Sequence, residues 1–194
     1  MNDTIAPDDE WLQRPRPISA DRAHAVGLIT LHWNLCETEL RSILIKYAGM
    51  DAQTGALFTL DMGFEGVKKR LSHFASQHER DPAVADRLRL GIEIADVCRR
   101  NRNIIAHSWI NLAGTKLFHE RMRDQPVTKV YRFDIEELRR VADELWDCGM
   151  FLLFLGLYLA ARGDPNWRQE LPQRIAVPKE IQPTDQFYPR ELEP

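Results

Sequence analysis

The last long apolar segment constrains the fold more than any other part of the chain. It follows Asp134, which can cap a helix together with Glu137 three residues on, and it ends before Gly163. Within it, residues 148–161 are apolar on every side of a helix. Such a helix must be buried, inside a bundle or partly against a second subunit. Fourteen residues are fewer than the roughly 20 needed to span a bilayer, so we expect no membrane insertion.

The earlier part of the chain carries further segments with the apolar spacing of helices. Ser19 can cap the first of them, and Asp81 followed by Pro82 is a strong start signal for the last. The expected helices before Asp134 cover about 20–49, 51–61, 64–78 and 82–109.

Between the last two long helices the apolar period changes. The stretches "TKLFHERM" and "VTKVYRF" are strand-like and flank the turn-like "RDQP". We expect a β-hairpin or a pair of extended segments within residues 110–133. The sequence therefore predicts an all-α protein, an up-and-down bundle of four to five helices with this insert between the last two long ones.

A chain of 194 residues fits one domain with tails. We expect an irregular N-terminal arm at 1–18, a helical domain at 19–162 and a proline-rich C-terminal arm at 163–194. The C-terminal arm could pack on the domain, pack on a partner or stay mobile.

Charge, cysteine content and histidine spacing limit the ligands and the compartment that we expect for this protein. A net charge of −3 leaves no global attraction for nucleic acid, so any such contact needs a local patch. Three separated cysteines without a CxxC motif, after an acidic start, predict a cytoplasmic chain with reduced, buried thiols. His73 and His78 are five residues apart, and no Cys/His cluster has metal-ligand spacing, so we expect neither metal nor cofactor.

The stretch "RNRNIIAHSW", residues 100–109, concentrates polar chemistry at one helix end. On a helical wheel Asn101 falls in the core stripe, where it must find hydrogen-bond partners. Arg102, Asn103 and His107 face outward around Ala106. Arg102 and His107 are about 140° apart on that wheel, so one helix does not easily bring them to a single target. Two copies about a two-fold axis could present both to one cleft.

Such a cleft has the groups that phosphodiester cleavage requires. Histidine moves protons near neutral pH, and arginine holds a phosphate and stabilises the charge that develops on it. Without metal ligands, the simplest reaction uses the RNA's own 2′-hydroxyl as the nucleophile.

The stretch "RNIIAH", residues 102–107, resembles the R-polar-x3–5-H motif of HEPN domains. These are dimerising helical bundles, often metal-independent ribonucleases of toxin–antitoxin, CRISPR-linked and anti-phage systems. The resemblance covers about 20–162 and implies Arg102 and His107 as the catalytic pair, with Asn103 orienting the site. It implies a homodimer, an RNA ligand and a possible antitoxin or partner protein. One subgroup has tyrosine two residues after the histidine, where this chain has Trp109.

The motif has two possible starting points. Arg100-Asn101 also fits the longer spacing, but Arg102 is favoured because Asn103 lies on the His107 side whereas Asn101 faces the core. Weaker substrate-binding candidates are basic residues nearby: Arg100, Arg99, Lys69, His73, Lys116 and His119.

Three functional hypotheses follow. The first is a metal-independent endoribonuclease acting as a toxin or defence effector. The second is a non-catalytic module that binds or senses a nucleotide, RNA or protein. The third, weaker hypothesis is a peripheral membrane protein that uses residues 148–161.

Overall fold

The computed structural model describes residues 18–121, 127–162, 164, 166 and 169–187. The arm expected at 1–18 lies outside the described residues except for Ile18, and so does the hairpin link at 122–126. The described residues form the following elements: α2 (Ala20–Tyr47), α3 (Ala52–Thr59), α4 (Phe64–His78), α5 (Pro82–Ala106), β1 (Trp109–Ile110), β2 (Lys116–Arg121), β3 (Val127–Arg132), α6 (Ile135–Ala161) and β4 (Asp185–Phe187).

The helices begin where their capping residues predict. The side chain of Ser19 accepts a hydrogen bond from the Arg22 amide, Asp81 accepts one from Ala83, and Asp134 accepts one from Glu137. After α2 the chain turns at Gly49, whose φ of 65° is in the left-handed region that glycine tolerates. The expected helices are therefore confirmed, with shorter bounds: α2 ends at Tyr47 instead of 49, and α3 covers Ala52–Thr59 instead of 51–61. The end of α5 moves most, to Ala106, three residues before Trp109.

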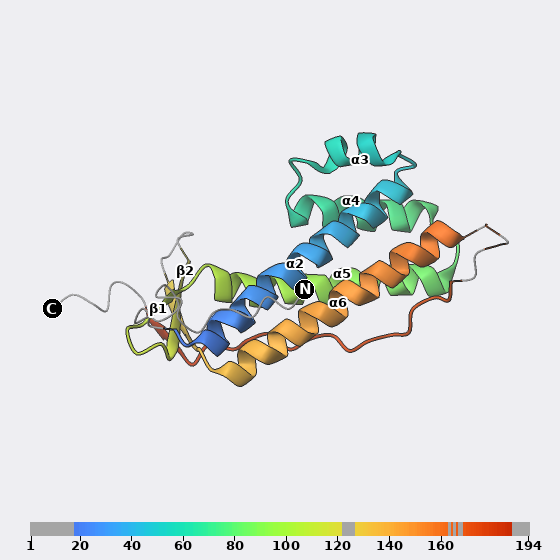
Figure 1. Ribbon diagram of the computed structural model, residues 1–194. Helices are drawn as coiled ribbons and strands as arrows, with labels where there is room; N and C mark the ends of the chain where they lie inside the picture. The colour runs from blue at the N-terminus through green and yellow to red at the C-terminus, as the bar shows by residue number, and fades with distance from the viewer. Residues whose placement is uncertain (1–17, 122–126, 163, 165, 167–168, 188–194) are drawn as a thin grey trace, which may run out of the picture.

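The helices alternate in direction along the chain when the short α3 is counted (Figure 1). Helices α2 and α6 run parallel, since their contacts advance along both helices, from His32 with Ala142 to Lys46 with Gly156. Helix α4 also runs parallel to α2, and α5 runs opposite to α6. Helix α3 runs back along α2, so that α4 starts beside Trp33.

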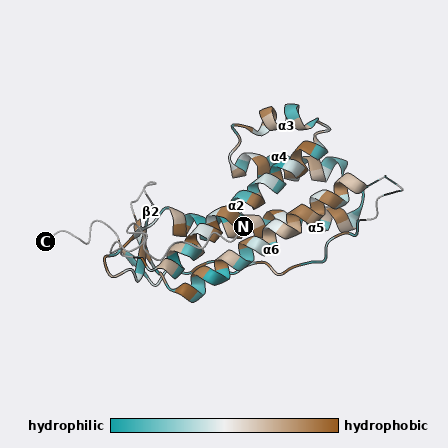
Figure 2. Ribbon diagram, in the orientation of Figure 1, coloured by the Kyte–Doolittle hydropathy of each residue, from teal (hydrophilic) through white to brown (hydrophobic). Residues whose placement is uncertain are grey.

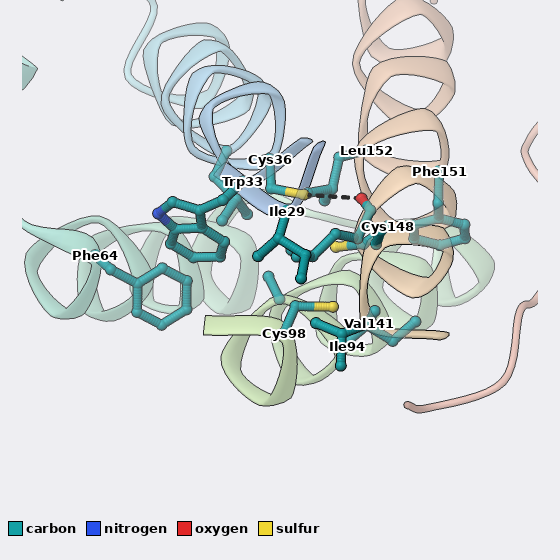
Figure 3. Packing of buried hydrophobic residues seen from close by; sticks show 14 of the residues in the cluster. Ile29, Trp33, Cys36, Phe64, Ile94, Cys98, Val141, Cys148, Phe151 and Leu152 are labelled. Carbon is teal, nitrogen blue, oxygen red and sulfur yellow. Dashed lines mark hydrogen bonds between the residues drawn. The ribbon is translucent and has the colours of Figure 1, made fainter. Parts of the chain in front are cut away.

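The core lies among α2, α5 and α6, and its centre holds all three cysteines (Figure 3). Cys36, Cys98 and Cys148 are free and buried, one on each helix. The Cys36 thiol donates to the Leu145 carbonyl at 3.3 Å, and Cys98 lies 3.8 Å from the Glu144 carbonyl. The prediction of buried, unpaired thiols is confirmed.

Helix α6 is the most apolar of the four long helices, and its second half carries most of its hydrophobic residues (Figure 2). Its composition would allow it to cross a bilayer, since one 18-residue window reaches a mean hydropathy of 1.5. That window is longer than the fourteen residues that the sequence pattern indicated. Central helices of bundles have the same composition, and here 44% of the window is buried within the chain.

The insert forms a four-stranded antiparallel sheet together with β4 of the C-terminal arm, in the order β1-β2-β3-β4. The hairpin of β2 and β3 confirms the strand prediction, with Leu117 opposite Tyr131 and His119 opposite Lys129. Strands β1 and β4 extend it on both sides. The protein is thus mostly helical with a small sheet, and an all-α description covers only the bundle.

Residues 169–187, here called the strap, pack on the domain. The strap runs along α5, where Arg87 donates to the Pro172 carbonyl at 2.9 Å, and ends as strand β4 beside β3 (Figure 1). Ile181 is buried in the core. Of the alternatives for the C-terminal arm, packing on the domain holds for this part.

Candidate functional site at the end of helix α5

Helix α5 ends beside the sheet because the chain must turn into β1. His107 is its C-cap, with φ −112° and ψ 12°, and its amide still donates to the Asn103 carbonyl at 3.0 Å. The Ser108 hydroxyl donates to the Ile104 carbonyl, and Trp109 then pairs with Phe118 across β1 and β2. This turn moves His107 off the helical wheel on which its position was predicted.

The turn brings the two motif residues together within one chain. Nη1 of Arg102 lies 3.3 Å from Nε2 of His107 and donates to Oδ1 of Asn103 at 3.1 Å. The expectation that one helix does not easily bring Arg102 and His107 to a single target is therefore wrong. It assumed helical geometry at position 107, where the backbone has already left the helix.

This contact limits the hydrogen-bonding role of His107. A guanidinium group has donors only, so in a hydrogen bond between the two groups Nε2 of His107 is the acceptor. An unprotonated ring nitrogen at an exposed position is the form that accepts a proton. Arg102 also keeps an unused donor, since its buried Nε has no hydrogen-bond acceptor among the described residues.

Asn101 has the structural role predicted for it. It is 1% exposed, its Nδ2 donates to the Lys179 carbonyl at 2.8 Å, and its Oδ1 accepts from the Ile181 amide at 2.9 Å. Both partners belong to the strap, so this buried amide fixes the strap to α5.

Arg99 and Arg100 contact carboxylates rather than the motif histidine. Asp96 accepts hydrogen bonds from Arg99 at 3.0 Å and from Arg100 at 2.7 Å, and Lys68 lies 3.4 Å away. Burial raises the pKa of Asp96, but the Arg99 hydrogen bond and the charges of Lys68 and Arg100 outweigh it, so that the pKa lies below its usual value. Asp96 therefore stays charged. Of the two motif arginines, Arg102 is the one that contacts His107.

A pocket of about 240 Å³ opens beside the motif, between α5, the hairpin and the strap. Its lining is mostly polar or charged and consists of Arg99, Arg100, Asn103, Ile104, His119, Lys129, Tyr131 and Glu180. Asn103 belongs both to the pocket and to the Arg102–His107 contact, so the two are continuous. His119, a weaker sequence candidate, reaches the pocket and lies 3.3 Å from the Ser108 hydroxyl.

Four pocket residues were not among the predicted site residues: Ile104, Lys129, Tyr131 and Glu180. Lys129 and Tyr131 share a sheet face with His119 because strand residues alternate and His119 is opposite Lys129. That alternation was visible in "VTKVYRF". Glu180 had no such signal, because its place depends on where the strap docks.

Other candidates lie apart from the pocket. Lys116 is exposed on β2 and faces the side of the sheet opposite to His119. Lys69 and His73 are exposed on α4, and the contact between α4 and this region runs instead through Lys68 and Asp96.

An aromatic pair flanks the motif. Trp109 stacks on Phe118 with ring centroids 4.1 Å apart and planes at 9°, and it remains 53% exposed. It therefore presents a flat apolar surface two residues after His107.

Within the described ranges, no three His, Cys, Asp or Glu side chains are arranged to hold a metal ion. Comparison of the chain with family models, with curated proteins and with solved structures finds no match.

Proposed function

We propose that the protein is an endoribonuclease of the HEPN type, with Arg102 and His107 as its catalytic pair. The observation that carries the proposal is the 3.3 Å contact between Nη1 of Arg102 and Nε2 of His107, at an exposed helix end. In this contact a guanidinium group, which can bind a phosphate, lies beside an imidazole nitrogen that can accept a proton. Asn103 supports the pair by accepting a hydrogen bond from Arg102.

In the proposed reaction, His107 takes the proton of an RNA 2′-hydroxyl. The 2′-oxygen then forms a bond to phosphorus, the bond from phosphorus to the 5′-oxygen breaks, and the products are a 2′,3′-cyclic phosphate and a 5′-hydroxyl. Arg102 stabilises the charge on the phosphate oxygens. The 5′-oxygen takes its proton from a protonated imidazole, for which the second His107 of a homodimer is the natural source.

The test is cleavage of RNA in EDTA by the wild type, His107→Ala and Arg102→Ala. General acid–base catalysis contributes about 10²–10⁴-fold, so we expect His107→Ala to lose at least about 100-fold in rate. His24→Ala is the matched control, because His24 is an exposed histidine of α2 remote in sequence from the motif. The proposal would be overturned if His107→Ala and Arg102→Ala cleaved RNA as fast as His24→Ala. It would also be overturned if the folded wild type cleaved none of a varied set of RNAs.

A second candidate function is binding without cleavage, of a nucleotide, RNA or protein. It is favoured by the carboxylates that already neutralise the arginines next to the pair: Glu65, Asp96 and Glu180 lie within 3.2 Å of Arg99 or Arg100. This function predicts nucleotide or RNA binding by wild type and His107→Ala alike, with no cleavage by either. We propose further that the ribonuclease acts as a homodimer in the cytoplasm, controlled by an antitoxin or another partner protein.

A further inference from the structure

The pocket between α5, the hairpin and the strap has more cations than carboxylates. Its lining includes three cations, Arg99, Arg100 and Lys129, and one carboxylate, Glu180, which comes from the strap. Beside the lining, Glu65 of α4 and Asp96 of α5 contact these arginines and Lys68. Without the charge of Glu180, four cations would therefore be matched by two carboxylates.

The pocket also has hydrogen-bond donors without acceptors. The Nε atoms of Arg99 and Arg100 are buried, and neither has a hydrogen-bond acceptor among the described residues. Buried donors are normally satisfied, by protein or by a bound group. Lys129, on the opposite wall, forms no ion pair within the part of the chain that the structure describes. An anion with several acceptor oxygens would satisfy these groups, and phosphate has that chemistry.

Glu180 is the one carboxylate that can leave. Its Oε1 lies 3.2 Å from Nε of Arg100 without forming an aligned hydrogen bond, and the two side chains are 45% and 37% exposed. Such half-exposed pairs contribute little to stability. The backbone around Glu180 is held separately, since Asn101 binds the Lys179 carbonyl and the Ile181 amide. Rotation of the Glu180 side chain therefore removes its carboxylate from the pocket lining without detaching the strap.

We propose that this pocket binds a phosphate group of a single-stranded nucleic acid backbone, and that Glu180 occupies the phosphate position until the ligand displaces it. The nucleic acid as the source of the phosphate rests on the proposed function. The pocket would hold a phosphate next to the scissile one, because Asn103 borders both the pocket and the Arg102–His107 contact. Arg99, Arg100 and Lys129 would bind its oxygens.

The test measures binding and not cleavage. The full chain is titrated with a labelled all-2′-deoxy oligonucleotide, which has no 2′-hydroxyl to attack, and separately with inorganic phosphate. We expect Lys129→Gln to weaken oligonucleotide binding about fivefold and to reduce the slope of log K against log salt by about 0.7. We expect Glu180→Gln to tighten binding about threefold.

Each variant has a control with the same change of charge. Lys116→Gln alters a lysine of the same hairpin on the other sheet face, and Glu136→Gln alters a carboxylate that is 76% exposed. Urea denaturation of all four variants establishes that they are folded. The proposal is overturned if Lys129→Gln and Glu180→Gln behave as their controls. Variant effects on phosphate binding alone would identify a free-phosphate pocket and overturn the nucleic acid assignment.

The outcome is distinguishable from failure of the ribonuclease proposal. If binding shows the expected pattern but His107→Ala cleaves as well as the wild type, the pocket stands and the catalytic assignment fails. If His107→Ala abolishes cleavage but Lys129→Gln and Glu180→Gln match their controls, only the pocket assignment fails.

Discussion

Single side chains hold distant parts of this chain together. Asn101 is the clearest case, since it is 1% exposed and bonds backbone groups 78 and 80 residues away. A polar group in such a place stabilises the fold only while both of its bonds are made, and leaving their partners unpaired has a cost of about 1–3 kcal/mol for each buried group.

Asn101→Ala should therefore lower the free energy of unfolding by about 2 kcal/mol, because the Lys179 carbonyl and Ile181 amide lose their partner. Urea denaturation monitored by circular dichroism measures the change. Asn34→Ala, an exposed asparagine of α2, is the control and should alter stability by less than about 0.5 kcal/mol. Equal midpoints for the two variants would show that Asn101 does not anchor the strap.

Glu79 plays a comparable role at the other end of the bundle. Its carboxylate accepts hydrogen bonds from Tyr47 at 2.6 Å, from the Asp81 amide at 2.8 Å and from Arg162 at 2.8 Å. Burial raises the pKa of Glu79, but these three donors outweigh it and lower the pKa below its usual value. A lowered pKa in the folded state means that the unfolded chain binds the proton first as the pH falls.

The stabilisation from Glu79 is therefore complete above the unfolded pKa, near 4.3, and is lost as the pH drops through the folded value. We expect Glu79→Gln to reduce stability at pH 7 and to flatten the decline between about pH 5 and pH 3. Urea midpoints over this pH range give the comparison. Glu136→Gln should retain the wild-type slope, and a steep acid decline in Glu79→Gln would mean that other carboxylates cause it.

At the scale of elements, two glycines in helices have opposite surroundings. A Cβ at Gly27 in α2 would have no heavy atom within 4 Å, whereas a Cβ at Gly55 in α3 would lie 2.4, 2.6 and 2.8 Å from three side-chain atoms of Ile45. Glycine at position 55 therefore allows α3 to approach α2, and glycine at position 27 has no comparable steric requirement.

Gly27→Ala should raise the free energy of unfolding by about 0.5–1 kcal/mol, because alanine is the better helix former at an open site. Gly55→Ala should lower it by about 1–3 kcal/mol, because Ile45 is branched and close on three atoms. Thermal unfolding of both variants shows whether each is more or less stable than the wild type. A stabilising Gly55→Ala would indicate that α3 moves away from α2 without cost.

The elements that the sequence predicted are those with local signals. Caps at Ser19, Asp81 and Asp134 place three helix starts, and alternation places the hairpin. The short strands β1 and β4 have two and three residues, too few for a period, and they exist because the hairpin offers them an edge. The end of α5 was predicted three residues too late for the same reason: pairing of Trp109 with Phe118 removes it from the helix.

At the scale of the whole molecule, the candidate site combines segments that no local pattern connects. The outward residues Arg102, Asn103 and His107 could be identified from the wheel, and Asn101 was correctly placed inside. The contact between Arg102 and His107 could not be predicted from the wheel, because it depends on the sheet that ends α5. The carboxylate of Glu180 enters the pocket only because the strap docks on Asn101, and prolines in the arm gave no indication of that docking.

The three core cysteines give the native chain an internal reporter of how it opens. Each thiol is at most 1% exposed and each belongs to a different helix, so an alkylating reagent reaches them only when the bundle separates. The neighbouring thiols and burial also raise the pKa of Cys148, which slows its reaction. Mass spectrometry of the alkylated chain would then show which helices separate in the same opening event. Modification of all three cysteines together would mean that the three helices separate in one cooperative step. Early labelling of Cys98 alone would identify α5, the helix that bears the motif, as the first to separate from the bundle.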